Sequence, residues 1–229
     1  MLPTLFISHG SPMLALEPGA SGPALSKLAA NIPRPSAIVV VSAHWESQRL
    51  LLTAGEHPQT WHDFGGFPAE LYAVQYPAPG APKLAEEIAQ QLNDVGLPAH
   101  LDAQRPFDHG AWVPLSLMYP NADIPVLQLS LPSHLGPELQ TRIGRALASL
   151  RAQGILLIGS GSITHNLGEL DWRAGPEVIE PWAGEFRDWM VGKLQADDRL
   201  ALLDYRRQAP HARRNHPSEE HLLPIYFAL

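Results

Sequence analysis

The run Ala-Ile-Val-Val-Val-Ser at residues 37–42 limits the fold more than any other feature of the sequence. β-Branched residues favour strands, and a strand with one face in water alternates apolar and polar side chains. Because this run does not alternate, it belongs in a sheet that is covered on both faces. We expect further strands at residues 2–8, 124–130 and 154–159, and weaker ones at 50–53 and 98–101.

Between these strands, apolar residues recur at helical spacing. Residues 81–95 carry Leu84, Ile88 and Leu92 and are followed by Gly96, which is typical of a helix C-terminus. We expect other helices at residues 110–118, 137–151, 181–194 and 218–227. Strands that alternate with helices predict an α/β fold with a central, mostly parallel or mixed sheet flanked by helices. No stretch resembles a linker, so a single domain over residues 1–229 is expected.

Composition excludes several classes of protein. The formal net charge of −7 argues against nucleic-acid binding, which needs clustered Lys and Arg. There are no cysteines, so a transition metal would be held by His, Asp or Glu. The sequence has neither a signal-peptide pattern nor an apolar run of about 18 residues. We therefore expect a cytoplasmic protein without a membrane segment.

One basic cluster comprises Arg206, Arg207, Arg213 and Arg214. Such a cluster forms a solvated loop in one interpretation. In the other, it receives a carboxylate-bearing substrate at the mouth of a pocket.

Three of the eleven histidines follow predicted strands: His9, His44 and His165. The carboxyl ends of parallel strands face one crevice, so three imidazoles there predict an open catalytic metal site, and imidazole suits iron and zinc. His109, at the start of a short helix, and His221, near the start of the last helix, are further candidates. The remaining histidines are interpreted mostly as surface residues: His57, His62, His100, His134, His211 and His216.

His62 is the exception, because it lies with Phe64 in an aromatic, glycine-rich loop. That loop either covers a pocket, where His62 and Phe64 would bind substrate, or packs as a surface loop.

Seven short motifs occur in order over almost the whole chain. They are Ser-His-Gly-Ser-Pro at 8–12, Val-Ser-Ala-His-Trp at 41–45, His-Asp-Phe-Gly-Gly-Phe-Pro at 62–68, Tyr-Pro-Ala-Pro-Gly at 76–80, Phe-Asp-His-Gly at 107–110, His-Asn-Leu at 165–167 and Glu-His-Leu-Leu-Pro at 220–224. With this ordered set the sequence resembles the LigB-type (class III) extradiol ring-cleavage dioxygenases, in particular the 4,5-DOPA dioxygenase extradiol-like branch.

The resemblance implies that His9, His44 and His221 are metal ligands. It implies that His165 is either an additional zinc ligand or the acid/base of the reaction, and that His109 hydrogen-bonds substrate or oxygen. The broader superfamily uses two His and a carboxylate, so Glu220 beside His221 leaves the third ligand open. Members of this branch usually continue into another strand, so we expect the family's C-terminal strand to be missing here.

The implied reaction is cleavage of a DOPA-like catechol with O₂ by a monomer or small homo-oligomer. Fe(II) supports activity, and Zn(II) can occupy the same site. His165 would remove a phenolic proton, since a neutral imidazole is suited to this near neutral pH. His165 or His109 would then return a proton.

Other classes remain as alternatives. A zinc hydrolase would use metal-bound water, but Glu46 is the only acid close to His44. A phosphohistidine enzyme needs Arg where Ser8 stands, and the Gly-Ser-Gly-Ser stretch at 159–162 lacks the ending of a P-loop. The last alternative is a non-catalytic metal-binding protein on the same fold.

Overall fold

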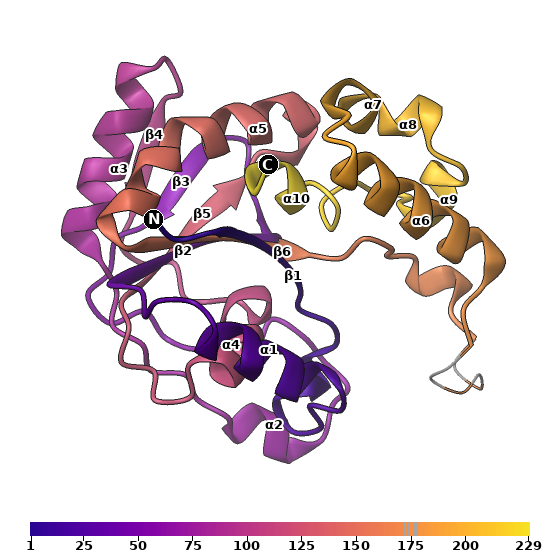
Figure 1. The fold of residues 1–229 in the computed structure, drawn as a ribbon. Coiled ribbons are helices and arrows are strands. Elements are labelled where there is room, and N and C mark those ends of the chain that lie inside the picture. Colours follow the sequence, from indigo (N-terminus) through magenta and orange to yellow (C-terminus); the bar gives the residue numbers. More distant parts are fainter. Residues whose placement is uncertain (172, 174, 176–177) are drawn as a thin grey trace.

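A six-stranded sheet lies at the centre of the molecule, in the order β1-β6-β2-β5-β3-β4 (Figure 1). The computed structural model describes residues 1–171, 173, 175 and 178–229. The strands are β1 (Thr4–Ser8), β2 (Ala37–Glu46), β3 (Leu50–Thr53), β4 (Ala99–Asp102), β5 (Val126–Leu131) and β6 (Ile155–Gly161).

The sheet is mixed. Strands β1, β6, β2 and β5 pair in parallel, whereas β3 runs antiparallel to β5 and β4 runs parallel to β3. The predicted α/β class with a mostly parallel or mixed sheet is thereby confirmed. All the strands expected from the sequence are present, with ends shifted by no more than a few residues.

Helices lie on both faces of the sheet and beyond one end of it. The helices of the described residues are α1 (Ser21–Ala30), α2 (Ala69–Ala73), α3 (Pro82–Asp94), α4 (His109–Met118), α5 (Gly136–Leu147), α6 (Pro181–Gln195), α7 (Arg199–Leu203), α8 (Tyr205–Gln208), α9 (Ala212–Asn215) and α10 (Pro224–Phe227). Short 3₁₀ turns are η1 (Pro12–Ala15), η2 (Ser133–Leu135), η3 (Ala148–Gln153) and η4 (Leu167–Glu169). In Figure 1, α1, α2 and α4 lie below the sheet, whereas α3, α5 and α10 lie above it. Within the described residues, no helix is both long and apolar enough to cross a membrane.

The apolar run in β2 explains the two cores. Val39 and Val41 pack into the cluster formed with α3, α5, α6 and α10, whereas Ile38 and Val40 pack into the cluster formed with α1, α2 and α4. Each of these four side chains is at most 1% exposed. Successive side chains of a strand point to opposite faces, so β2 is apolar throughout because both faces are buried, as predicted.

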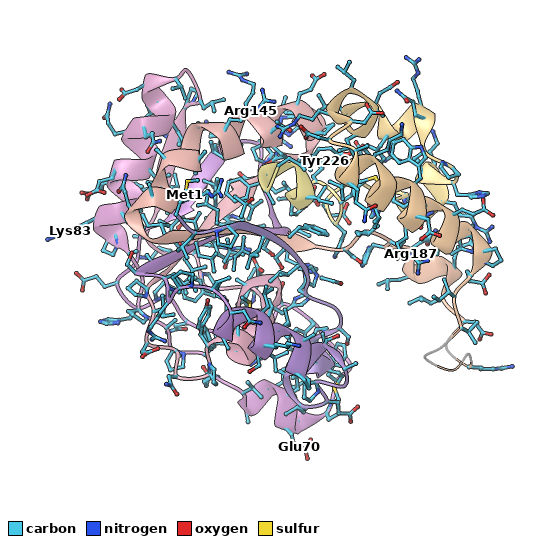
Figure 2. All side chains as sticks on the ribbon, viewed as in Figure 1. Met1, Glu70, Lys83, Arg145, Arg187 and Tyr226 are labelled. Carbon is cyan, nitrogen blue, oxygen red and sulfur yellow. The ribbon has the colours of Figure 1, made fainter. Side chains whose placement is uncertain are left out.

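The side chains separate by chemistry around this framework. Figure 2 shows charged residues such as Lys83, Arg145 and Arg187 pointing outward, whereas Tyr226 on α10 lies inside the molecule. Tyr226 is fully buried, and its hydroxyl donates to the carbonyl oxygen of Leu202 (2.7 Å). This bond joins α10 to α7.

The prediction of one helix over residues 218–227 is wrong for the first half of this range. Its amino-terminal part forms turns, closed by bonds from the N–H groups of Leu222 and Leu223 to the carbonyl of Glu219 (2.9 and 3.0 Å), and only α10 is helical. Proline has no N–H to donate and favours the first position of a helix. Pro224 therefore starts a new helix instead of continuing one.

Candidate metal centre

Three histidines meet at the carboxyl edge of the parallel strands. His9 follows β1, His44 lies at the end of β2, and His221 lies in the turn that precedes α10. One ring nitrogen from each lies within 4.8 Å of the others. The Nε2 atoms of His9 and His44 are 3.0 Å apart. The structure therefore brings together the three residues that the family resemblance implies as ligands.

Glycines make this close approach possible. A Cβ at Gly161 would lie 2.1 Å from the carbonyl oxygen of His221, and one at Gly110 would lie 3.1 Å from Cδ2 of His44. The His221 carbonyl also accepts the N–H of Ser162 (2.7 Å). The turn carrying His221 is thus held against the end of β6, where only glycine leaves room for it.

A hydrogen-bond chain orients the His9 ring. The hydroxyl of Ser160 donates to the carbonyl of Gly110, so its oxygen accepts the Nδ1–H of His9 (3.0 Å). This network assigns the proton to Nδ1 and leaves Nε2, which faces His44, with a free lone pair. Such a bond behind a ring is typical of metal-binding histidines.

The carboxylate of Glu220 has the same role behind His221. Its Oε1 accepts the Nδ1–H of His221 (2.9 Å). Burial alone would raise the pKa of the Glu220 carboxyl, but hydrogen bonds from His221 and Ser218 outweigh burial and lower the pKa to about 2. Glu220 is therefore ionised and engaged with His221. The arrangement favours His221 over Glu220 as the third donor.

The donor set fits a transition metal. Burial, followed by the neighbouring histidines, lowers the pKa of His9 well below its usual value and that of His44 to about 3. Both rings are therefore neutral at neutral pH, as ligation requires. Two nitrogens that bind one ion at about 2.1 Å are at most about 4.2 Å apart, and the observed His9–His44 distance of 3.0 Å is within this limit.

His165 lies beside this cluster rather than inside it. Its ring stacks on His221, with centroids 3.4 Å apart and planes 7° from parallel. Its close ligand atoms are those of Glu220 and His221. Burial, followed by His221, lowers the pKa of His165 to about 4.

His109 packs against His44, with ring centroids 3.8 Å apart. One oxygen of Asp63 accepts both the backbone N–H of His109 (2.9 Å) and its Nδ1–H (3.0 Å). Burial alone would raise the pKa of Asp63, but the hydrogen bonds and charge of His109 lower it. Asp63 thus fixes the orientation of the His109 ring through Nδ1.

The loop at residues 62–68 continues this side of the site. Phe64 packs edge-on against His109, with centroids 5.7 Å apart and planes at 84°. His62 lies close to Phe64, Tyr72 and Trp112, and its Nε2–H donates to the carbonyl of Val74 (3.0 Å). Phe64 is therefore nearer the metal cluster than His62 is, and both remain predicted substrate-binding residues.

A cavity of about 480 Å³ is lined in part by His44 and His221. Its remaining lining residues are Ala43, Glu46, Ser218 and Glu220. Its volume is in the range of pockets that bind small molecules.

Two sequence interpretations are resolved by the structure. His216 is fully buried, not a surface residue, and its Nε2–H donates to the carbonyl of Ile163 (2.6 Å). Within the arginine cluster, Arg206 pairs with Glu219 and Arg214 with Glu169. These pairs are typical of a solvated surface, and the cluster's segment forms short helices that the sequence did not indicate.

The sequence reasoning missed the residues that support the histidines: Ser160, Asp63, Asp108 and Arg105. Asp63 lies in the motif at residues 62–68, next to His62, and Asp108 lies in the motif at 107–110, next to His109. These positions are the only sequence indication that the two carboxylates belong to the site.

Comparisons with known proteins identify the family of this chain. Residues 3–229 match the family described as the catalytic LigB subunit of aromatic ring-opening dioxygenase. The chain is 42% identical to "4,5-DOPA dioxygenase extradiol" of Escherichia coli K12, covering 100% of this chain and 84% of the relative. It is also 42% identical to the Beta vulgaris protein of the same name, covering 99% and 85%. A crystal structure of an uncharacterized E. coli K12 protein superposes with a TM-score of 0.82 at 36% identity, covering 100% of this chain and 88% of that one.

A family match over nearly the whole chain decides between the alternatives raised by the sequence. Neither the matched family nor these relatives supports a zinc hydrolase or a non-catalytic scaffold. LigB dioxygenases depend on a metal and take O₂ and a small-molecule substrate, and the histidine cluster offers a site for the metal. The chain belongs to the LigB family, and it is an extradiol ring-cleavage dioxygenase, as the sequence predicted.

Proposed function

We propose that this protein opens the ring of a DOPA-like catechol with O₂, using Fe(II) held by His9, His44 and His221. The observation that carries the proposal is the cluster of three ring nitrogens within 4.8 Å of one another. The cluster adjoins a cavity of about 480 Å³, in a chain whose relatives are named for DOPA cleavage.

His9, His44 and His221 would hold Fe(II), which would bind catechol and O₂ and allow electrons to pass between them. Zn(II), which prefers the same nitrogen donors but does not change its redox state, would occupy the site without supporting the reaction. We therefore propose Fe(II) as the active metal.

We assign the proton transfers to the two histidines that flank the cluster. His165 stacks on His221 and is half-buried, so it can reach a substrate that lies over the cluster and accept a phenolic proton at a ring nitrogen. His109 is oriented by Asp63 with Nε2 free. Its Nε2 is placed to hydrogen-bond the substrate, to take up a phenolic proton and to return that proton later in the reaction.

The aromatic loop would hold the ring of the substrate. Phe64 contacts the face of the site at His109, so its ring can pack against the catechol. His62 supports Phe64 from behind, with Nε2–H bonded to Val74. We also propose that the protein resides in the cytoplasm and that it is a monomer or a small homo-oligomer.

The test is anaerobic reconstitution with Fe(II), followed by O₂ and a panel of catechols that includes DOPA. We expect a yellow ring-opened product with consumption of O₂. The His9→Ala variant should lose both metal and activity, whereas His165→Ala should keep the metal and lose activity. A His165→Ala variant that retains the full rate, or a parent protein inactive on every catechol, would contradict the proposal.

A further inference from the structure

Arg105 contacts the segments that carry His44, Asp63 and His109. Its Nη2 donates to the carbonyl oxygen of His44 and to Oδ2 of Asp108, both at 3.1 Å. The guanidinium carbon lies 4.8 Å from the ring centroid of Trp45 and 4.6 Å from that of Trp61. Two indole rings and two oxygen acceptors thus determine the position of one charged group.

The contacts of Arg105 join three segments that are distant in sequence. Trp45 directly follows His44 on β2, and Trp61 lies two residues before Asp63, which orients His109. Asp108 directly precedes His109 at the start of α4. One guanidinium therefore bridges the segments that carry His44 and His109, whose rings are 3.8 Å apart.

The second acceptor, Asp108, is itself held firmly. It is fully buried, and it accepts Ser42 Oγ–H (2.6 Å) and Gln128 Nε2–H (2.8 Å) in addition to Arg105. The same Ser42 oxygen accepts the backbone N–H of His44 (3.1 Å). The network closes on His44 from two directions, through its N–H and through its carbonyl.

The burial of this arginine is costly for stability. Only 14% of its side chain is exposed, and its Nε is buried without a hydrogen-bond partner among the described residues. A buried ion pair is often no more stabilising than apolar residues of the same volume, and an unpaired buried N–H adds a further cost. The arrangement is therefore better explained by geometry than by stability, since it fixes a carbonyl, a carboxylate and two rings at once.

We propose that Arg105 is a positioning residue of the metal centre, which holds His44 in its ligand geometry and at its distance from His109. The proposal rests on the proposed function, in which His44 is a ligand. It requires the planar guanidinium, because a lysine ammonium keeps the charge but cannot stack between two indoles while it donates in a fixed plane.

The test measures metal binding without the reaction. Co(II) is titrated into Arg105→Lys, and its visible spectrum and its affinity, by competition with a chromophoric chelator, are compared with those of the parent. We expect an affinity about 10–100-fold weaker, as for the loss of groups that orient ligands, and a changed spectrum. With Fe(II) and catechol, kcat should fall more than KM rises.

The matched control is Arg151→Lys. Arg151 also donates to a backbone carbonyl, that of Leu2 (2.7 Å), but this lies before β1, at the opposite end of the strand from His9. The Arg151→Lys variant should therefore keep the Co(II) spectrum and the Co(II) affinity of the parent. A second variant, Trp61→Leu, changes a side chain that is 40% exposed and leaves the bonds of Arg105 in place; we expect the same spectral change, but smaller.

If Arg105→Lys unfolds at a lower temperature but keeps the parent spectrum and affinity, the role of Arg105 is only structural and the inference is wrong. His44→Ala separates this outcome from a failure of the proposed function. If His44→Ala binds Co(II) like the parent, the ligand set is wrong. If His44→Ala loses binding but Arg105→Lys and Trp61→Leu do not, only the inference about Arg105 fails.

Discussion

Asp63 is the residue whose removal tests the proposed proton-transfer machinery most directly. Its Oδ1 accepts both the backbone N–H and the Nδ1–H of His109, at 2.9 and 3.0 Å. Asp63→Ala removes both bonds, so the ring can rotate and its proton can move to Nε2. Hydrogen bonds to a charged group contribute about 1.5–3 kcal/mol each. If the variant loses about 3 kcal/mol of the free energy that these bonds contribute to the transition state, kcat should fall by on the order of a hundredfold.

Asp63→Asn separates charge from orientation. The amide oxygen can accept the same two bonds, and a neutral acceptor is roughly half as strong as a charged one. We therefore expect a loss of about tenfold in kcat, which lies between the parent and Asp63→Ala. Initial rates of product formation are measured with Fe(II)-reconstituted protein at saturating catechol, and metal content is determined on the same samples. Asp123→Asn, which changes an exposed partner of Arg34, is the control and should not alter kcat.

Two results would refute this reasoning. If Asp63→Ala keeps the parent kcat, the orientation of His109 does not depend on Asp63. If Asp63→Ala instead loses its metal, the carboxylate is a ligand, since Asp63 also lies within 4.8 Å of a His44 nitrogen.

Three further changes test other parts of the structure. Ser160→Ala removes the acceptor of the His9 Nδ1–H, so metal affinity should fall about 10–100-fold in a chelator competition. Gly161→Ala places a Cβ 2.1 Å from the His221 carbonyl, so we expect loss of metal and of about 1–3 kcal/mol in the free energy of unfolding, measured with denaturant. Burial lowers the pKa of His216 from 6.5 to about 4. Between these pH values the unfolded chain binds the proton that the folded chain excludes, so stability should fall as the pH falls, by about 3 kcal/mol in total at this residue.

Each of these predictions has a contrary outcome. Parent-like affinity in Ser160→Ala would mean that the proton on His9 is placed by other groups. Gly192→Ala is the control for the glycine, because nothing lies within 4 Å of its added Cβ. If that variant loses as much stability as Gly161→Ala, the clash is not the cause. For His216, a His216→Gln variant with the same loss of stability between pH 6.5 and 4 as the parent would contradict the assignment.

Much of the fold could be predicted because it depends on local patterns. Both faces of β2 are buried, so residues 37–42 do not alternate between apolar and polar side chains. Six residues of sequence are therefore enough to predict a strand that is covered on both sides. His9 and His44 were predicted to converge because each comes directly after a run of this kind, and parallel strands end at one edge. The third histidine, His221, needed the family resemblance, because it lies in a turn rather than after a strand.

The supporting contacts could not be predicted in this way. Asp63 and His109 are 46 residues apart, Ser160 and His9 are 151 residues apart, and no local pattern pairs them. His216 is preceded by arginines and followed by Pro217, so its neighbours in sequence are polar, yet the packing of Phe186 against its ring belongs to a buried environment. Such contacts form between segments that are brought together only by the complete fold, so they cannot be read from a local sequence pattern.

The separation of the three histidines in sequence has a consequence for how the protein is made. During synthesis, a nascent chain displays His9 and His44 long before His221 has been added, and the segment with His221 is held only once it docks against the end of β6. The three proposed donors therefore lie together only once this segment has docked. With the proposed ligands, the metal would be taken up after this docking, and it would then link the segment after β1 to the turn before α10. Cellular quality control would consequently act on the metal-free and metal-bound forms to different extents, because a ligand that binds only the folded state stabilises that state.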